Sequence, residues 1–329
     1  MTITAKINKN NPESEIILKA AEIIKNGGLV AFPTETVYGL GADALNPEAV
    51  KKIYLAKGRP SDNPLILHVE NINQVYDLVE VNETAEILMK KFWPAPLTLV
   101  MKAKNIIPSI TRGGLETAAI RMPNNLVALA LIKAAGTPIA APSANLSGRP
   151  SPTDFESVFN DMNGKIEMIL DGGSVDVGIE STVIDITNPK KFLMLRPGGM
   201  NRKILEETLN SRLEIPDSNS KKRSPGTRYR HYAPNIPVLI WKNGEKFPEK
   251  NNAAYIGLHE PEVKNINLRE KIIFKTVKDF AKELFAAFRK FERENFSCVI
   301  VEWPEGDFIN EENEISEGLR DRIERASRN

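Results

Sequence analysis

Residues 54–69, YLAKGRPSDNPLILHV, join the end of a predicted helix to a predicted strand through a turn rich in glycine and proline. Gly58 lies just past the last helical turn, where glycine commonly ends a helix, and the apolar run PLILHV (64–69) is typical of a short buried strand. This helix–turn–strand unit is a building block of α/β folds. Lys57 and Arg59 place two cations at the turn, which raises the question of what anion they meet.

The rest of the first 200 or so residues continues this alternation of helices and short strands. Residues 12–25 carry apolar side chains at helical spacing before a Gly-Gly pair, which ends the predicted helix. Strand-like runs such as LTLVM (97–101) and TVIDIT (182–187) are separated by turn-forming residues. We therefore predict an α/β domain over residues 1–208, built on a large, mixed, twisted sheet with helices packed on it.

A change in composition marks a second domain. The segment EIPDSNSKKRSPGTRYRHYAPNIP (214–237) contains four prolines and few aliphatic residues, so we assign 209–235 as a linker. Beyond it, three strand-like runs, a helical pattern, a fourth strand-like run and a second helical pattern predict a small Rossmann-like α/β domain over 236–329. The linker is basic and alternates tyrosine with arginine. It is either a solvated hinge or, as we predict, a lid across an active site.

The composition limits the function classes. The chain has 329 residues, with 44 Lys and Arg against 43 Asp and Glu, so no overall charge steers it to nucleic acid or to a membrane. Its single cysteine, Cys298, cannot form a disulfide within the chain, and the histidines lack the spacing of a helix-borne zinc site, so we predict no protein-held metal. We find no signal-like leader and no apolar run of ~18 residues, and therefore expect a cytoplasmic protein without membrane contact.

Glycine motifs carry little information here. No G-x-x-x-x-G-K-[ST] phosphate loop is present. The stretch GLGADA (39–44) matches the G-x-G-x-x-G/A dinucleotide pattern, but such short patterns recur by chance. We interpret it as a turn that lets two backbones approach closely.

Cations and hydroxyls nevertheless gather at the ends of predicted elements. Lys57 and Arg59 lie at a helix C-terminus, where the helix dipole alone would favour them, while Arg121 lies near a strand end and Arg196 precedes a Pro-Gly-Gly turn. The loop APSANLSGRPSPT (141–153) is either a solvated surface turn or a set of hydroxyl, amide and backbone N–H groups that suits phosphate oxygens. If the sheet places these ends along one edge, they form an anion-binding site.

The chain contains seven motifs that resemble those of the YrdC-like threonylcarbamoyl-AMP synthases and that occur in the same order as in that family. A later segment, SPGTRYRHYAPNIPV (224–238), resembles the linker of the two-domain members. The chain differs from the usual pattern at Ala95, at Thr227 and in the C-terminal EGLRDRIERAS (317–327), which lacks a GLG turn. The seven motifs are FPTETVYGLG (32–41), KGRPSDNPLILHV (57–69), PLTLV (96–100), AIRMP (119–123), APSANLSGRPSPT (141–153), GIESTVID (178–185) and LRPGG (195–199).

The resemblance implies an enzyme, a nucleotidyltransferase. It would convert L-threonine, bicarbonate or CO2, and ATP into L-threonylcarbamoyl-AMP and pyrophosphate, for the threonylcarbamoyladenosine modification of tRNA. Mg²⁺ would accompany ATP. A separate tRNA threonylcarbamoyl transferase would consume the product without forming a stable complex, and weak tRNA binding is a further implied contact. Because the carboxylated amine of threonine is already an anion, the protein chiefly has to gather negative charges and stabilise the charge that develops at phosphorus.

The resemblance also assigns roles to residues of this chain. Arg121 suits the threonine carboxylate, since a guanidinium group can bind both carboxylate oxygens. The implied threonine-binding residues are Thr36, His68, Arg121, Ala141 and Ser181. The implied ATP-binding residues are Lys57, Arg59, Asn63, Thr117, Ser143, Asn145, Ser151, Arg196 and Arg230, of which Lys57, Arg59, Ser143 and Asn145 are also the implied catalytic residues.

Two other readings of the same residues stay open at this point. A non-catalytic protein that binds double-stranded RNA or tRNA could use the same cations on phosphates, although they are interleaved with hydroxyls and glycine turns more than with stacking aromatics. A different adenylate-forming or carbamoyl-transferring enzyme could use the same fold on another substrate. Only the threonine contacts distinguish the second alternative from the main prediction.

Overall fold

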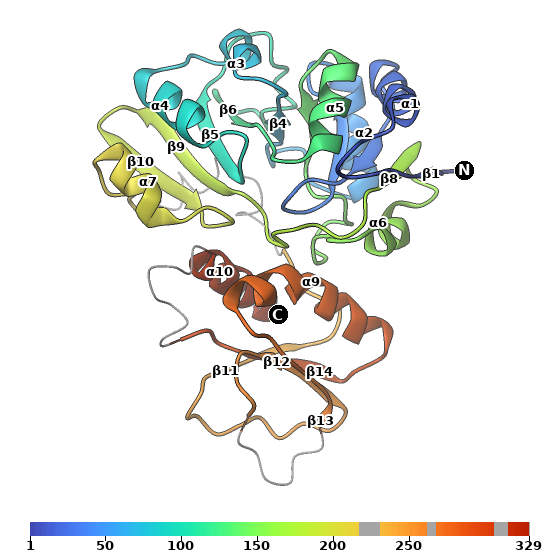
Figure 1. The fold of residues 1–329 in the computed structure, drawn as a ribbon, viewed down its shortest axis with the longest axis vertical. Helices are drawn as coiled ribbons and strands as arrows, with labels where there is room; N and C mark the ends of the chain where they lie inside the picture. Colours follow the sequence, from blue (N-terminus) through green and yellow to red (C-terminus); the bar gives the residue numbers. More distant parts are fainter. Residues whose placement is uncertain (217–230, 262–267, 306–314, 329) are drawn as a thin grey trace.

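The computed structural model describes residues 1–216, 231–261, 268–305 and 315–328. Within these residues the chain forms two sheets in separate parts of the molecule, joined near the middle of the long axis (Figure 1). Residues 217–230 of the linker that we predict as a lid, Arg230 among them, lie outside the described residues.

The first domain is built on a ten-stranded sheet with the strand order β1-β8-β2-β3-β7-β4-β6-β5-β9-β10. Parallel pairs such as β4–β6 and β5–β9 alternate with antiparallel pairs such as β5–β6 and β9–β10, so the predicted large mixed sheet is confirmed. Its strands are β1 (Ile3–Lys6), β2 (Val30–Phe32), β3 (Gly39–Asp43), β4 (Ile66–His68), β5 (Leu97–Lys102), β6 (Thr117–Arg121), β7 (Ile139–Ala140), β8 (Met168–Asp171), β9 (Thr182–Asn188) and β10 (Lys191–Arg196).

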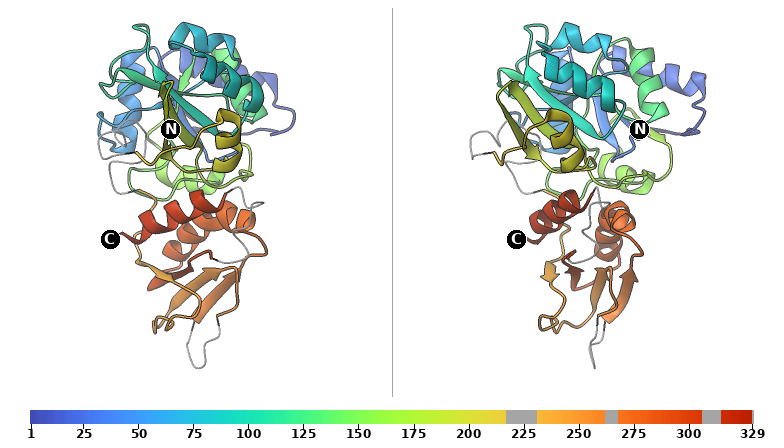
Figure 2. Two further views of the ribbon diagram at one scale, coloured as in Figure 1. Left: turned by 90° about the vertical axis from the view of Figure 1, so that its left-hand side faces the viewer. Right: turned by 60° about the vertical axis from the view of Figure 1, so that its left-hand side comes forward.

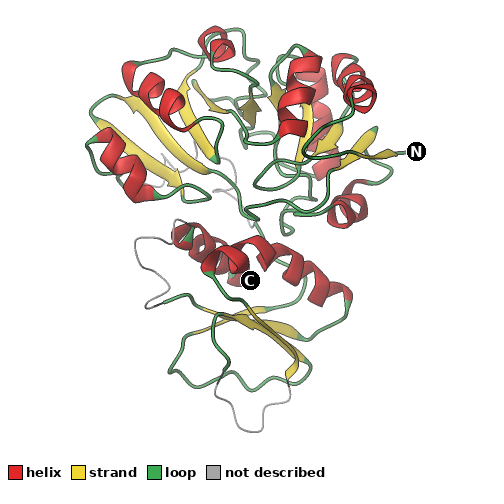
Figure 3. Cartoon of the chain, in the orientation of Figure 1, coloured by secondary structure: helices red, strands yellow, loops and turns green. Residues whose placement is uncertain are grey.

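Helices cover both faces of this sheet (Figure 3). Helices α1 and α5 share one apolar cluster with Val30 and Phe32 of β2, whereas α2, α4 and α6 share another with Leu67 of β4. The helices of this domain are α1 (Ser14–Lys25), α2 (Pro47–Lys57), α3 (Asn73–Leu78), α4 (Glu83–Phe92), α5 (Leu126–Ala135), α6 (Phe155–Met162) and α7 (Arg202–Leu209).

Helix α2 begins and ends at residues that favour helix boundaries, and its end at Gly58 is the predicted one. The side-chain oxygen of Asn46 accepts hydrogen bonds from the backbone N–H groups of Glu48 and Ala49, at 3.0 and 3.2 Å. Gly58 takes a left-handed conformation (φ 60°) that a residue with a side chain rarely adopts, and this ends the helix. In the turn after it, Arg59 donates to the backbone oxygen of Pro64, two residues before β4, so this local signal helps to position the site described below.

The second domain has a four-stranded parallel sheet in the order β11-β14-β12-β13, as expected for a small parallel-sheet domain. Helices α9 and α10 lie between this sheet and the first domain, and Figure 2 shows α10 (red) against the first domain in both views. The elements are β11 (Val238–Trp241), β12 (Ala253–Gly257), β13 (Leu268–Ile273), α9 (Val277–Arg293), β14 (Cys298–Glu302) and α10 (Ser316–Ser327). The proposed domain boundaries at residues 208 and 235 stay predictions.

The two domains pack together with their backbones in close contact. A Cβ atom added at Gly318 of α10 would lie 2.9 Å from the Cα of Gly198, and one added at Gly178 would lie 2.2 Å from the Cα of Lys282 in α9. Ile179 of the first domain belongs to the apolar core formed by α9, α10 and the small sheet. The glycines therefore allow an approach that any side chain would block.

Buried ion pairs accompany this packing. Arg289 of α9 lies 2.8 Å from the fully buried Asp161 of α6, and its guanidinium also donates to the backbone oxygen of Pro150. Arg149 pairs with Asp161 at 3.1 Å and with Glu292 of α9 at 2.8 Å. Arg289 and Glu292 of the second domain thus contact the 141–153 loop of the first domain, a loop that also forms part of the site.

Candidate functional site

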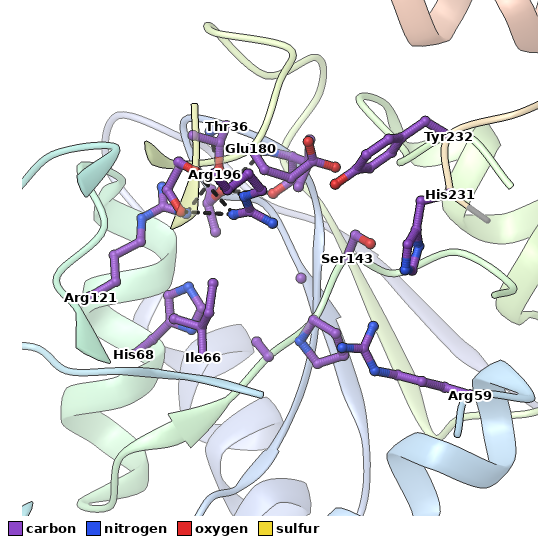
Figure 4. A pocket seen from close by; sticks show the side chains of 16 residues that line it. Thr36, Arg59, Ile66, His68, Arg121, Ser143, Glu180, Arg196, His231 and Tyr232 are labelled. Carbon is purple, nitrogen blue, oxygen red and sulfur yellow. Dashed lines mark hydrogen bonds between the residues drawn. The ribbon is translucent and has the colours of Figure 1, made fainter. Parts of the chain in front are cut away.

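A pocket forms where the ends of several strands of the large sheet meet (Figure 4). Its walls come from strands β3, β4, β6 and β10, from the segments that precede β3 and β9 and follow α2 and β7, and from the described C-terminal end of the linker. In Figure 4, Arg121 and His68 lie on one side of the cavity, and Arg59, His231 and Tyr232 lie on the other. The strand-end cations and the loop residues therefore share one hollow, as the sequence predicts.

Arg121 dominates the first side. It lies at the end of β6, is 3% exposed, and donates from Nη1 to Thr36 Oγ1 at 3.0 Å. Its Nη2 lies 2.7 Å from Glu35 Oε2, an ion-pair distance without hydrogen-bond geometry, and its Nε has no partner within the described part of the chain. Because buried polar atoms are normally satisfied, a guanidinium with spare donors facing a cavity is typical of a site for an anion.

His68 lies next to Arg121, in register with it on the neighbouring strand β4. Burial, together with the nearby charge of Arg121, lowers the pKa of His68 to about 3. The imidazole is therefore neutral at physiological pH, and its Nδ1 has no partner among the residues that the structure describes. A neutral ring can bind a polar substrate group without adding a further positive charge.

Arg196, at the end of β10, also lines the pocket. Its Nε and Nη2 donate to the backbone oxygen of Ser181 at 3.2 and 3.0 Å, and Nη2 also reaches the Ser181 hydroxyl at 3.2 Å. That hydroxyl shares a 2.8 Å hydrogen bond with Thr98. Burial is the main cause that lowers the pKa of Arg196, but an arginine guanidinium remains protonated at neutral pH.

Arg59 provides the cation on the opposite side. Its Nη2 donates to the backbone oxygen of Pro64 at 3.1 Å and lies 3.4 Å from that of Asn63, while its Nε has no partner in the described ranges. Burial lowers its pKa to about 10, which still leaves the group protonated at neutral pH. The pocket thus carries buried positive charge on both sides, and a ligand with two anionic ends fits this arrangement.

Comparison with known proteins identifies the family. A family profile described as telomere recombination (Sua5/YciO/YrdC) matches residues 22–198, and a profile described as the C-terminal domain of threonylcarbamoyl-AMP synthase matches residues 200–328. The threonylcarbamoyl-AMP synthase of Pyrococcus abyssi is 42% identical over 316 residues, 92% of this chain and 92% of that protein. This chain belongs to the threonylcarbamoyl-AMP synthase family, in its two-domain form.

Other members of the family support the same assignment. The threonylcarbamoyl-AMP synthase of Bacillus subtilis is 50% identical over 244 residues, which cover 72% of this chain and 69% of that protein. The crystal structure of P. abyssi Sua5 complexed with L-threonine superposes with a TM-score of 0.88 and 39% identity, covering 99% of this chain and 98% of that one. These relatives are enzymes by name, which confirms the prediction of an enzyme and gives no support to the RNA-binding alternative.

The residues that we predicted on the threonine side of the synthase site all line the pocket. Thr36, His68, Arg121, Ala141 and Ser181 come from five separate segments of the chain, and the fold brings them together. Among the predicted ATP-side residues, Arg59, Ser143 and Arg196 also line it. The roles assigned to these residues stay predictions, but their convergence on one cavity is now a structural fact.

Lys57, which we predicted on the ATP side, contacts the 141–153 loop and does not line the pocket, and its role stays a prediction. Its ammonium lies outside the set of pocket-lining residues and donates to the backbone oxygens of Ser143 and Asn145, each at 2.5 Å. Burial, with the charge of Arg59 next, lowers the pKa of Lys57 well below its usual value. Asn145 likewise uses its amide within the loop, donating to Leu146 and Arg149 oxygens. Both side chains therefore hold the 141–153 loop in shape.

The remaining predicted ATP-side residues are less directly placed. Asn63 is fully buried beside Arg59, and neither atom of its amide has a partner among the described residues. Ser151 donates its hydroxyl to Oε1 of Glu180, which does line the pocket. Thr117 lies at the start of β6, four residues from Arg121, and is not part of the lining.

Sequence reasoning missed the carboxylate of the pocket, Glu180, and its partner in the second domain. Arg322 of α10 donates from Nε to Glu180 Oε2 at 2.6 Å. Burial acts to raise the pKa of Glu180, but the charges of Arg322 and Arg196 and the hydrogen bonds from Ser151 and Arg322 outweigh it, so the pKa lies below its usual value. Glu180 belongs to the GIESTVID motif and could have been singled out there, whereas nothing local marks Arg322.

His231 and Tyr232 also complete the pocket, directly after the undescribed part of the linker. Burial, with the positive charges of Arg59 and Lys57, lowers the pKa of His231 to about 3. The Tyr232 ring stacks on Phe285 of α9, with ring centroids 5.5 Å apart, and the guanidinium carbon of Arg322 lies 4.9 Å from its centroid. The described C-terminal end of the linker therefore lines the pocket, and Tyr232 packs against the second domain.

Two further searches cover the described residues only. No helix among them is both long and apolar enough to cross a membrane. No group of three or more His, Cys, Asp or Glu side chains in the described ranges is arranged to hold a metal ion. The cytoplasmic location stays a prediction.

Proposed function

We propose that this chain makes L-threonylcarbamoyl-AMP in the pocket of its first domain, from L-threonine, bicarbonate or CO2, and ATP, with release of pyrophosphate. Family membership supports this proposal, as does the L-threonine complex of the P. abyssi relative. The observation that carries it is the convergence of Arg59, Arg121 and Arg196 on one cavity that also contains unsatisfied buried polar atoms. Such atoms are costly unless a ligand completes their hydrogen bonds.

Threonine binds on the Arg121 side in this proposal. Its carboxylate takes the spare donors of the guanidinium, and it competes with Glu35, which now lies 2.7 Å from Nη2. The neutral His68 accepts a hydrogen bond from the amine, and Thr36 and Ser181 supply hydroxyls for the side chain. A site that satisfies the threonine hydroxyl should reject analogues lacking it, because its own buried groups would be left unpaired.

The chemistry then needs little proton transfer by the protein. The amine nitrogen of threonine forms a bond to the carbon of CO2 and releases a proton to solvent, which gives an N-carboxylate. One oxygen of this carboxylate attacks the α-phosphorus of ATP, and the bond from that phosphorus to the bridging oxygen breaks as pyrophosphate leaves. Arg59 and Arg196 stabilise the negative charge that develops on the phosphates, and the pocket holds the reactants in line.

Magnesium enters this scheme with ATP. The carboxylates near the pocket, Glu35 and Glu180, each lie against an arginine, and the described residues contain no cluster of metal-binding side chains. The ion would therefore be carried by the triphosphate oxygens, where it neutralises charge on the reacting phosphates. The product would pass to a separate transferase that modifies tRNA, and any binding of tRNA by this chain would be weak.

The test measures pyrophosphate release by the purified full chain with ATP, Mg²⁺, bicarbonate and L-threonine. We expect release that stops when threonine alone is omitted and that falls sharply with 2-aminobutyrate, which lacks the hydroxyl. Release that is independent of threonine would overturn the threonine assignment, and the absence of release with all substrates present would overturn the proposed reaction. Formation of the adenylate product should be followed in the same samples by mass spectrometry.

A further inference from the structure

A carboxylate lies in the wall of a pocket that we propose for anions. Glu180 is 6% exposed and lines the cavity together with Arg59 and Arg196. ATP and the threonine carboxylate are both negatively charged, so an uncompensated carboxylate at this position would repel them. A cation must therefore compensate Glu180, in addition to the cations that meet the substrates.

Arg322 of the second domain is that cation. It is fully buried, and its Nε lies 2.6 Å from Glu180 Oε2. Its Nη1 donates to the backbone oxygen of Pro197 at 3.1 Å and to Asp321 at 2.5 Å, and its Cζ lies 4.9 Å from the ring centroid of Tyr232. Arg322 therefore touches two pocket-lining residues and the turn that follows Arg196, although it does not line the pocket itself.

The position of Arg322 depends on how α10 docks. Leu319 and Ile323 of the same helix are fully buried in the apolar core that includes Ile179, the residue before Glu180. Gly318, one turn before Arg322, allows α10 to approach the backbone of Gly198. The guanidinium thus reaches Glu180 from a helix that packs into the apolar core and against the backbone of Gly198, so the packing of the helix fixes where the side chain starts.

We propose that Arg322 is a positioning residue for the substrate pocket: it neutralises Glu180 and holds its carboxylate in the wall, so that the second domain completes a site otherwise built by the first. Ser151, which donates to the other oxygen of Glu180, belongs to the 141–153 loop that Arg289 also contacts. The second domain therefore acts on the pocket through two arginines from two helices. This inference rests on the proposed function, because ATP is the ligand by which it is measured.

A merely structural ion pair and a positioning pair make different predictions. Removing one partner of a buried pair leaves an uncompensated charge, whereas removing both charges can be nearly neutral. If Arg322 only anchors α10, its loss will have the same effect whether or not residue 180 carries a charge. If it neutralises Glu180 in an anion site, its loss will weaken ATP binding only while that charge is present.

The experiment is a double-mutant cycle in the full chain with Arg322→Met, Glu180→Gln and the combined variant. We expect Arg322→Met to raise KM for ATP by roughly tenfold or more, with a smaller change in kcat, because the charge left behind is buried. In the Glu180→Gln background the same substitution should change KM by less than about twofold. Arg322→Lys, which keeps the positive charge and loses the planar guanidinium group, should give an intermediate KM for ATP.

Controls separate this result from a loss of folding or of the proposed reaction. Glu317→Gln removes the 3.3 Å ion pair between α10 and Arg202, away from the pocket, and should leave KM for ATP unchanged. Circular dichroism and thermal unfolding report whether each variant folds, and calorimetry of Mg²⁺-ATP binding gives a readout that does not require turnover. Wild-type protein that binds Mg²⁺-ATP but shows no threonine-dependent turnover would overturn the proposed function alone.

Two outcomes would overturn the inference itself. The first is an Arg322→Met variant whose KM and dissociation constant for ATP stay within about twofold of wild type. The second is an effect of Arg322→Met that is equally large with glutamine at position 180, including a failure to fold in both backgrounds. Arg322 would then be an anchor of α10 and would have no influence on the pocket through Glu180.

Discussion

His68 and Arg121 lie directly opposite each other on the parallel strands β4 and β6, both buried, and both line the pocket. Two groups that can each carry a positive charge thus share one buried region. Arg121 forms an ion pair with Glu35, while burial and the nearby charge of Arg121 lower the pKa of His68 to about 3, so His68 is the group that stays neutral.

The first prediction concerns stability at acidic pH. The unfolded chain binds a proton on His68 near pH 6.5, whereas the folded chain does so only near pH 3. Between these values the unfolded state holds more protons, so the free energy of unfolding falls as the pH falls, by up to about 1.4 kcal/mol per pH unit. His231 has the same depressed pKa and should add a similar slope. Urea unfolding at several pH values between 4.5 and 7.5 measures the total slope.

His68→Gln provides the comparison for that measurement. The variant lacks one titrating group, so its free energy of unfolding should depend on pH less steeply than that of the wild type, by about one proton. Above pH 6.5 the free energies of unfolding of the two proteins should depend on pH in the same way, because neither protein gains a proton at position 68 on unfolding there. Equal slopes below pH 6 would show that His68 is not a buried neutral histidine.

The second prediction tests whether Arg121 needs the several donors of its planar guanidinium group. Arg121→Lys keeps a positive charge but cannot donate to Thr36 and to a carboxylate at the same time in the same plane. We expect KM for threonine to rise by roughly tenfold or more, and KM for ATP to change by less than about threefold. Lys102→Arg, at the far exposed end of the neighbouring strand β5, is the matched control and should change neither value. An equal rise in both KM values would contradict separate sides of the pocket.

The third prediction concerns the opposite side. Arg59→Gln removes the buried charge that lies across the cavity from Arg121. Calorimetry should show binding of Mg²⁺-ATP weakened by about tenfold or more, while threonine binding without nucleotide stays near the wild-type value. Arg112→Gln is the matched control, because the guanidinium of Arg112 donates to two backbone oxygens outside the pocket lining. This variant should bind Mg²⁺-ATP as the wild type does. Unchanged ATP affinity in Arg59→Gln would remove Arg59 from the nucleotide side.

The fourth prediction distinguishes loop support from phosphate contact at Lys57. Its ammonium holds the backbone oxygens of Ser143 and Asn145, so Lys57→Met should lower the free energy of unfolding without any ligand, by about 1–3 kcal/mol. Lys51→Met, at an exposed position of the same helix, should change it by less than about 0.5 kcal/mol. A Lys57→Met variant as stable as the wild type, yet defective in ATP binding, would favour direct contact with phosphate.

The sequence predicts much of this site because its motifs mark the ends of strands. Arg121 and Arg196 each follow an apolar run, and Ser181 precedes one, so a sheet that places these ends together also places the side chains together. Arg59 follows a helix whose end is fixed by Gly58. Such placements depend on local signals, namely apolar periodicity, caps and turns, which can be read from a single chain.

Other features depend on contacts that no local pattern contains. Lys57 and Arg59 are two positions apart, yet one supports a loop and the other faces the cavity. Lys57 donates to the backbone oxygens of Ser143 and Asn145 in the 141–153 loop, whereas Arg59 donates to that of Pro64 next to β4. Arg322 and Glu180 are 142 positions apart and meet only through the docking of two domains. Periodicity could predict that α10 is amphipathic, but not which partner its buried arginine would find.

The last prediction concerns the docking of α10 itself. Gly318→Ala should be favourable for an isolated helix by about 1 kcal/mol, since alanine has the higher helix propensity. In this fold the new Cβ would lie 2.8 Å from the oxygen and 2.9 Å from the Cα of Gly198, and backbone atoms cannot move aside as a side chain can. We therefore expect a net loss of stability, and a rise in KM for ATP because α10 and Arg322 are pushed away from Glu180. Ser327→Ala, in the last turn of the same helix, tests the propensity effect without the clash. Thermal unfolding and ATP titrations of both variants test this. A Gly318→Ala protein that is more stable than wild type and has an unchanged KM for ATP would contradict close docking.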